Sequence, residues 1–174
     1  GIPPERLVPL DLRSENIPFV SIHVPAYKEQ PHVLEETLRA LSKLQYTNYE
    51  VLVVINNTSE EFYWKPIEKV CQELGDKFVF MNITCTGFKA GALNAALEQT
   101  NKEAEIIAVI DADYVVEPTW LVDLVPLFDD PKVAIVQAPQ DHRDGDESIL
   151  KAAMNAEYAG FFDIGMIDRN EENA

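Results

Sequence analysis

Two aspartates separated by one alanine, Asp111 and Asp113, are the residues of this chain that point most directly to chemistry. They follow residues 106–110, Ile-Ile-Ala-Val-Ile, an apolar run with the length and composition of a buried parallel strand. Two carboxylates this close repel each other unless a cation lies between them. Their hard oxygen ligands favour Mg²⁺ or Mn²⁺ over Zn²⁺. The pattern predicts a divalent-metal site at a strand end, although a single carboxylate would suffice for an ordinary turn there.

A lysine among small residues is the second candidate. Lys89 lies in residues 86–94, Thr-Gly-Phe-Lys-Ala-Gly-Ala-Leu-Asn, at the start of a predicted helix. Small residues let a backbone approach a ligand closely, and a helix N-terminus favours anions. The helix dipole disfavours a lysine at this position. A bound phosphate would therefore explain Lys89 as well as simple solvation beside a helix cap.

The elements that must position these residues alternate along the chain. Apolar runs suited to strands are separated by segments of helical periodicity, which predicts an α/β fold with a mostly parallel, doubly wound sheet flanked by helices. Gly75 marks the end of the second helix, and Pro118 is placed for the first turn of the fourth. The predicted strands are residues 19–24, 49–55, 78–83, 106–110 and 133–136, and the predicted helices are about residues 31–44, 60–74, 87–97, 117–128 and 147–161.

Polar residues also follow the first two predicted strands. Tyr27 and Glu29 come after the first strand, and Asn56 and Asn57 come after the second. Ligands bind outside the carboxyl ends of the strands in open α/β sheets, so we expect these residues at the same edge as the aspartates. A plain strand-to-helix loop and a helix-capping turn are the simpler interpretations of the two segments. His23, in the middle of the first strand, is predicted to be a core histidine and not a ligand.

Composition excludes several classes of protein. The 174 residues suffice for one domain. A formal net charge of −16 argues against nucleic-acid binding through a basic groove. Apolar runs of about five residues are far shorter than the roughly 20 that a membrane span needs. Cys71 and Cys85 lack metal-ligand spacing and are predicted to be free thiols in a reducing compartment. The chain has no G-x-G-x-x-G or Walker lysine motif, so dinucleotide-binding and P-loop functions have no support.

Four motifs in order carry a family resemblance. They are residues 24–29 (Val-Pro-Ala-Tyr-Lys-Glu), 87–94 (Gly-Phe-Lys-Ala-Gly-Ala-Leu-Asn), 111–113 (Asp-Ala-Asp) and 136–140 (Val-Gln-Ala-Pro-Gln). Together they resemble the processive family 2 glycosyltransferases, the cellulose synthase-like and bacterial β-glucan synthase group. The resemblance covers roughly residues 18–170. It implies a GT-A (Rossmann-like) fold and a nucleotide-sugar donor, namely a UDP-sugar.

The resemblance also implies roles for individual residues. Asn56 occupies the segment where family members usually carry an aspartate that contacts the base, and its amide can still hydrogen-bond a uracil edge. Asp111 would lie near the ribose as well as the metal. The implied site consists of Pro25, Ala26, Tyr27 and Glu29 lining the nucleotide pocket, Lys89 approaching the diphosphate, Asp111 and Asp113 holding Mg²⁺ or Mn²⁺, and Gln137 and Gln140 toward the sugar or acceptor.

Two family motifs are absent from the chain. The Thr-Glu-Asp motif that supplies the general base and the Gln-x-x-Arg-Trp acceptor motif are both expected beyond residue 174, as are the membrane helices. We therefore expect residues 1–17 to form an irregular lead-in and residues 18–174 the nucleotide-sugar-binding part of a GT-A domain, truncated before its second half. The parent would be an inverting polysaccharide (β-glucan) synthase at the cytoplasmic face of the inner membrane. The fragment itself would be soluble and would bind donor without turnover.

Two other functions stay open from the sequence. Residues 111–116 fit the D-x-D-x-[TV] pattern of haloacid-dehalogenase-type phosphatases, in which Asp111 would be phosphorylated. That motif usually follows the first strand of its domain, whereas three strand–helix units precede it here. A non-catalytic interaction module would show no metal-dependent nucleotide binding.

The segment 158–167 is rich in large apolar residues, including Phe161 and Phe162. One helical face cannot bury them all, so we expect them to drive self-association.

Overall fold

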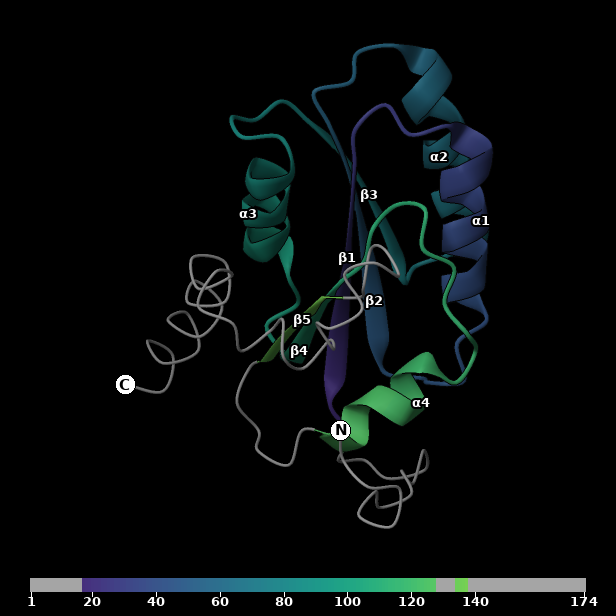
Figure 1. Ribbon diagram of the computed structural model, residues 1–174, viewed down its shortest axis with the longest axis vertical. Coiled ribbons are helices and arrows are strands. Elements are labelled where there is room, and N and C mark those ends of the chain that lie inside the picture. The colour runs from purple at the N-terminus through teal and green to yellow at the C-terminus, as the bar shows by residue number, and fades with distance from the viewer. Residues whose placement is uncertain (1–16, 128–133, 138–174) are drawn as a thin grey trace, which may run out of the picture.

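A parallel sheet forms the centre of the fold (Figure 1). The computed structural model describes residues 17–127 and 134–137. Within them, five parallel strands lie in the order β3-β2-β1-β4-β5. The chain order reverses direction between β1 and β4, and such a switch point is where open α/β sheets bind ligands. The strands are β1 (Phe19–Ala26), β2 (Tyr49–Asn56), β3 (Phe78–Ile83), β4 (Ala104–Val109) and β5 (Ala134–Gln137).

Helices cover both faces of the sheet (Figure 1). Helices α1 (Pro31–Ser42) and α2 (Glu61–Leu74) pack side by side on one face, and α3 (Lys89–Gln99) lies on the other. The short α4 (Trp120–Leu124) continues into a 3₁₀ turn, η2 (Val125–Leu127). The structure thus confirms the predicted α/β fold with a parallel sheet flanked by helices.

The alternation of residues along the strands produces two apolar layers. Toward α1 and α2, each of the three central strands contributes buried aliphatic side chains, which pack with Leu34, Leu38 and Leu41 of α1. Toward α3, Leu52 and Val54 of β2 pack against alanines of the helix. A fully buried aliphatic side chain contributes about 1.5–3 kcal/mol, so these layers hold the strand ends in fixed register.

Most predicted boundaries agree with the structure, and the exceptions involve proline and backbone geometry. Gly75, with φ +102°, ends α2 as predicted. The predicted helix over residues 117–128 is shorter: α4 begins at Trp120, and Pro118 lies before it, its carbonyl accepting a hydrogen bond from the Gln45 N–H at 2.8 Å. Pro126 has no N–H and disfavours helical geometry at the residue before it, so α4 changes into a 3₁₀ turn.

Several sequence predictions fall outside the described residues. These are the lead-in up to residue 16, the predicted helix 147–161, Gln140, and the apolar segment 158–167 with Phe161 and Phe162. Within residues 17–127 and 134–137, no helix is long and apolar enough to cross a membrane. Both cysteines are free thiols, as predicted.

Candidate functional site

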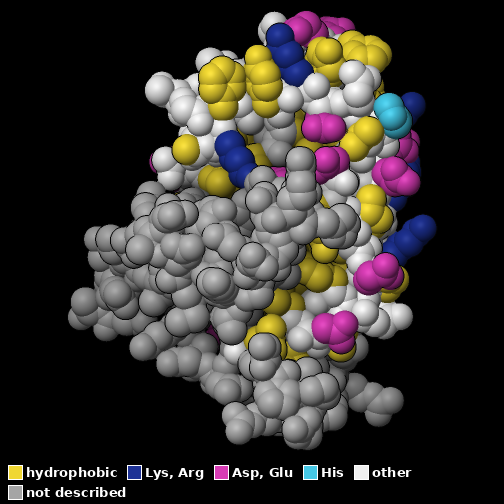
Figure 2. Space-filling view, in the orientation of Figure 1, with side chains coloured by type: hydrophobic (Ala, Val, Ile, Leu, Met, Phe, Trp, Pro, Cys, Tyr) yellow, Lys and Arg dark blue, Asp and Glu magenta, His cyan; other side chains and the backbone are white. Residues whose placement is uncertain are grey.

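The predicted site residues converge on the carboxyl edge of the sheet, at the switch point between β1 and β4. Tyr27 directly follows β1, Asn56 is the last residue of β2, and Asp111 lies two residues after β4. In the orientation of Figure 1 this edge lies toward the top, where Figure 2 shows acidic and basic side chains between exposed hydrophobic ones. The convergence follows from parallel strands, whose carboxyl ends share one edge.

A tight turn presents the two aspartates. The Tyr114 N–H donates a hydrogen bond to the Asp111 carbonyl at 3.1 Å, which closes the turn. Ala112 is buried between a partly buried Asp111 and an exposed Asp113. Thr37, a buried residue of α1, donates its hydroxyl to the Ala112 carbonyl at 2.6 Å. This hydrogen bond therefore anchors the turn to α1, through a residue that lies 75 positions earlier in the chain.

Lys89 is directed at this turn. Its Nζ lies 2.9 Å from Asp111 Oδ1, with side-chain exposures of 41% for Lys89 and 22% for Asp111. An ion pair this exposed adds little stability by itself. The position of Lys89 is more informative than the strength of this ion pair. Lys89 places an ammonium group at the N-terminus of α3, where backbone N–H groups also attract anions.

A third carboxylate lies near the aspartates. Partial burial, followed by the negative charges of Asp113 and Asp111, raises the pKa of Glu29. The residues after β1 and β4 thus concentrate negative charge and hard oxygen donors in one place. Within the described ranges, no three His, Cys, Asp or Glu side chains are arranged to hold a metal on their own. Two aspartate carboxylates fit a Mg²⁺ or Mn²⁺ ion that takes its remaining oxygens from water and a ligand.

The chain from the end of β3 to the first residue of α3 contacts residues beyond the carboxyl ends of three strands in turn. Asn57, just beyond β2, donates from Nδ2 to the Cys85 carbonyl at 2.9 Å and accepts from the Cys85 N–H at 2.8 Å. Phe88 then meets Tyr27 beyond β1, with ring centroids 4.9 Å apart. Lys89 reaches Asp111 beyond β4. This crossing brings Lys89 to the switch point.

Two residues near the start of α3 meet unusual constraints, one on its backbone angles and one on its size. Phe88 has φ +47° and ψ −106°, the first central position of a turn closed by the Ala90 N–H and the Gly87 carbonyl at 3.0 Å. This conformation favours glycine, and a bulky residue there stores on the order of 1–3 kcal/mol of strain. At Gly91, a Cβ would lie 2.3 Å from the Thr86 carbonyl oxygen. Small residues here were predicted to let a ligand approach the backbone. Gly91 instead makes room for the chain's own residues Cys85 and Thr86.

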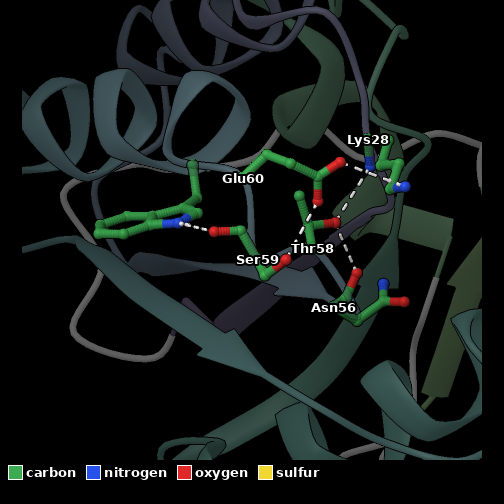
Figure 3. Close-up of polar contacts among 6 residues, drawn as sticks. Lys28, Asn56, Thr58, Ser59 and Glu60 are labelled. Carbon is green, nitrogen blue, oxygen red and sulfur yellow. Dashed lines mark hydrogen bonds and ion pairs between the residues drawn. The ribbon is translucent and has the colours of Figure 1, made fainter.

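Figure 3 shows a polar network that joins the loops after β1 and β2. The Thr58 hydroxyl donates to the Asn56 carbonyl at 2.8 Å and accepts from the Lys28 N–H at 3.3 Å. Lys28 Nζ lies 3.2 Å from a Glu60 carboxylate oxygen, and this hydrogen bond raises the pKa of Lys28. The polar run predicted to cap α2 thus links two loops, while Glu60 occupies the N-cap position without a side-chain capping bond.

The remaining predicted lining residues differ in accessibility. Tyr27 is exposed, whereas Pro25 and Ala26 are buried in β1. Asn56 is 1% exposed, donates from Nδ2 to the Ala26 carbonyl at 3.0 Å, and its Oδ1 has no partner among the described residues. Contact between Asn56 and a base stays a prediction. Gln137 is the last residue of β5, in register with Val109 of β4.

His23 takes no part in the site, in agreement with its prediction as a core histidine. It is fully buried, and burial lowers its pKa to about 3. The Ser21 hydroxyl donates its hydrogen to the Glu50 carboxylate, and the Thr100 hydroxyl donates its hydrogen to the Ala96 carbonyl. Both hydroxyl oxygens can then only accept from His23, which assigns the ring proton to Nε2. His23 Nε2–H donates to both hydroxyl oxygens, at 3.0 and 3.1 Å.

Comparison with known sequences agrees with this geometry. The sequence model described as "Glycosyl transferase family 2" matches residues 21–173. The chain belongs to glycosyl transferase family 2. The phosphatase alternative is disfavoured by this membership and by the position of Asp111 after the fourth strand.

Two curated relatives give the range of this similarity. The chain is 34% identical over 149 residues to a beta-monoglucosyldiacylglycerol synthase of Trichormus variabilis, covering 82% of this chain and 30% of the relative. It is 33% identical over 128 residues to the probable glucomannan 4-beta-mannosyltransferase 7 of Oryza sativa subsp. japonica, covering 70% of this chain and 22% of the relative. The chain thus spans less than a third of the length of either relative.

A solved structure supports the GT-A assignment. The mannosyltransferase PcManGT from Pyrobaculum calidifontis, in complex with GDP-Man and Mn²⁺, superposes with a TM-score of 0.59. The two sequences are 27% identical, and the match covers 75% of this chain and 38% of that one. The predicted GT-A, Rossmann-like fold is confirmed.

Proposed function

We propose that this chain binds the nucleotide-sugar donor of a family 2 glycosyltransferase, together with Mg²⁺ or Mn²⁺ held by Asp111 and Asp113. The observation that carries the proposal is the Lys89–Asp111 contact of 2.9 Å at the switch point of the sheet. It joins a cation from a helix N-terminus to a carboxylate pair, which are the two charge types needed for a metal diphosphate. Family membership and the neighbour solved with GDP-Man and Mn²⁺ support it.

The residues around the turn suit a diphosphate. Lys89 would donate a charge-assisted hydrogen bond to a phosphate oxygen, exchanging part of its present contact with Asp111. The metal, when bound, would neutralise charge on the diphosphate leaving group. The chain has a net charge of −16, so an anionic donor needs these local positive charges.

The finer assignments belong to the same proposal. We assign the donor as a UDP-sugar, and GDP is its natural comparison because PcManGT was solved with GDP-Man. The loop from Pro25 to Glu29 would line the nucleotide pocket, and Gln137 and Gln140 would lie toward the sugar or acceptor. The whole enzyme would transfer a hexose to a growing polysaccharide with inversion, at the cytoplasmic face of the inner membrane.

Titration calorimetry tests the proposal. UDP and GDP are each titrated into the chain with Mn²⁺, with Mg²⁺, and with EDTA. We expect metal-dependent binding of at least one nucleotide, and we expect Asp113→Asn to abolish it. Asp76→Asn, which changes an exposed aspartate in the turn after α2, is the matched control and should bind as the wild type does. Equal binding in EDTA and in Mn²⁺ would overturn the metal assignment.

A further inference from the structure

Two large aromatic side chains meet at the site although both are largely exposed. Tyr27 is 46% exposed and Phe88 is 51% exposed. Their rings form an edge-to-face pair with an interplanar angle of 83°. Aromatic side chains gain most when their faces are covered. The pair therefore makes a right-angled corner with apolar surface left in contact with solvent.

The fold holds Phe88 in this corner against its local preference. Its φ of +47° lies in the region that favours glycine, and Gly87 stands one position earlier in the chain. Neither burial in the core nor backbone preference accounts for a phenylalanine at this position. Its contact with Tyr27 is the one aromatic contact described between the loops after β1 and β3.

The corner lies beside the diphosphate position of the proposed function. Phe88 and Lys89 are consecutive, yet they contact residues beyond different strands: Tyr27 beyond β1 and Asp111 beyond β4. A nucleoside diphosphate with its phosphates at Lys89 would thus have its base within reach of the two rings. A base can stack on one ring face while its edge meets the other ring, and such stacking is tolerant of base identity.

We propose that Phe88 is a nucleotide-binding residue that forms, with Tyr27, an aromatic corner for the nucleobase of the donor. This proposal rests on the proposed function. The corner favours nucleoside diphosphates over bare diphosphates, and it accepts a pyrimidine or a purine. The choice between UDP and GDP is then made by other groups that contact the edges of the base.

Affinities for UDP, GDP and inorganic pyrophosphate, each measured with Mn²⁺, test the corner. Phe88→Gly removes the ring and relieves the backbone, while Phe88→Leu keeps apolar bulk without a stacking face. We expect Phe88→Gly to weaken binding of the nucleotides roughly 5- to 150-fold, the range for loss of one aromatic stacking partner. Pyrophosphate affinity should stay unchanged, and the thermal unfolding midpoint should rise. Phe62→Leu alters another exposed aromatic, on α2, and should leave nucleotide affinity unchanged.

The outcomes separate the two proposals. If wild-type chain binds neither nucleotides nor pyrophosphate with Mn²⁺, the proposed function fails, and the corner fails with it. If the wild type binds nucleotides but Phe88→Gly and Phe88→Leu retain full affinity, the proposed function stands and the corner is overturned. Equal loss of nucleotide and pyrophosphate binding would also overturn it, because Phe88 would then act by positioning Lys89.

Discussion

At the scale of single residues, Lys89 has the clearest measurable role. It lies in the first turn of α3, an unfavourable place for a cation, and its ammonium group is 2.9 Å from Asp111. We expect Lys89→Ala to weaken UDP far more than uridine, because only UDP loses a charge-assisted hydrogen bond of about 1.5–3 kcal/mol. Calorimetry with both ligands in Mn²⁺ measures the difference. Lys65→Ala, on the exposed surface of α2, is the control. Equal weakening of UDP and uridine would assign Lys89 to the fold or the base pocket.

His23 makes a second residue-scale prediction, about acid stability. Its pKa is about 3 in the folded chain, against an ordinary value of 6.5. The folded pKa is the lower one, so below pH 6.5 the unfolded state takes up a proton that the folded state refuses. This residue therefore reduces the free energy of unfolding as pH falls from about 6.5 toward 3, by up to about 1.4 kcal/mol per pH unit. His23→Gln should flatten that dependence in urea unfolding between pH 6.5 and 4.5. His32→Gln, an exposed control, should retain the wild-type slope. An unchanged slope in His23→Gln would contradict the assignment.

The sequence predicted some of the residues at this edge and missed others for a physical reason. Asp111, Lys89 and Tyr27 are predictable from local context, because each is a polar or charged residue just after an apolar strand or at a helix start. Thr37 and Phe88 are not. The role of Thr37 depends on a hydrogen bond across 75 residues of chain, and that of Phe88 depends on its backbone angles and its contact with Tyr27. Neither is visible in a local pattern of residue types.

At the scale of secondary structure, helix α1 supports the aspartate turn. The Thr37 hydroxyl satisfies the Ala112 carbonyl in a buried setting. Thr37→Val keeps the shape and leaves that carbonyl unpaired, so we expect a loss of about 1–3 kcal/mol in the free energy of unfolding. Mn²⁺-dependent UDP binding should weaken as well, because the turn that carries both aspartates loses its anchor.

Thr37→Ser retains the hydroxyl and serves as the matched control. Urea unfolding and calorimetry should place it near the wild type in metal-dependent affinity. If Thr37→Val loses stability but keeps full Mn²⁺-dependent affinity under conditions where it is folded, the hydrogen bond stabilises the core without positioning the turn.

Element boundaries were predictable where side-chain chemistry sets them and not where tertiary contacts do. Continuous apolar runs located the strands, and Gly75 located the end of α2, because these signals are local. The start of α4 was predicted too early. Proline at the first turn of a helix is common, but Pro118 instead lies in a loop held by Gln45 from a distant segment.

At the scale of the whole molecule, strand order assembles the site. Alternating strands and helices predict a parallel sheet, but they do not state which strands are neighbours. In the order β3-β2-β1-β4-β5, the connection from β3 to β4 must cross over β2 and β1. That path sets Cys85, Phe88 and Lys89 against three separate strand ends. The site is thus a property of the topology as much as of its motifs.

Hydrogen exchange measured along the whole chain tests this view. If the loops after β1, β3 and β4 form one site, UDP with Mn²⁺ should slow amide exchange together in residues 27–30, 85–91 and 111–114. These segments lie far apart in sequence and meet only at the carboxyl edge. The opposite edge of the sheet, which includes residues 43–48 before β2, provides an internal control whose exchange should not change. Slowing confined to a single segment would contradict a shared site, whereas uniform slowing of the whole chain would indicate global stabilisation by the ligand. A joint response that disappears in Asp113→Asn is the expected result, because the ligand bridges the three loops only when the metal turn is intact.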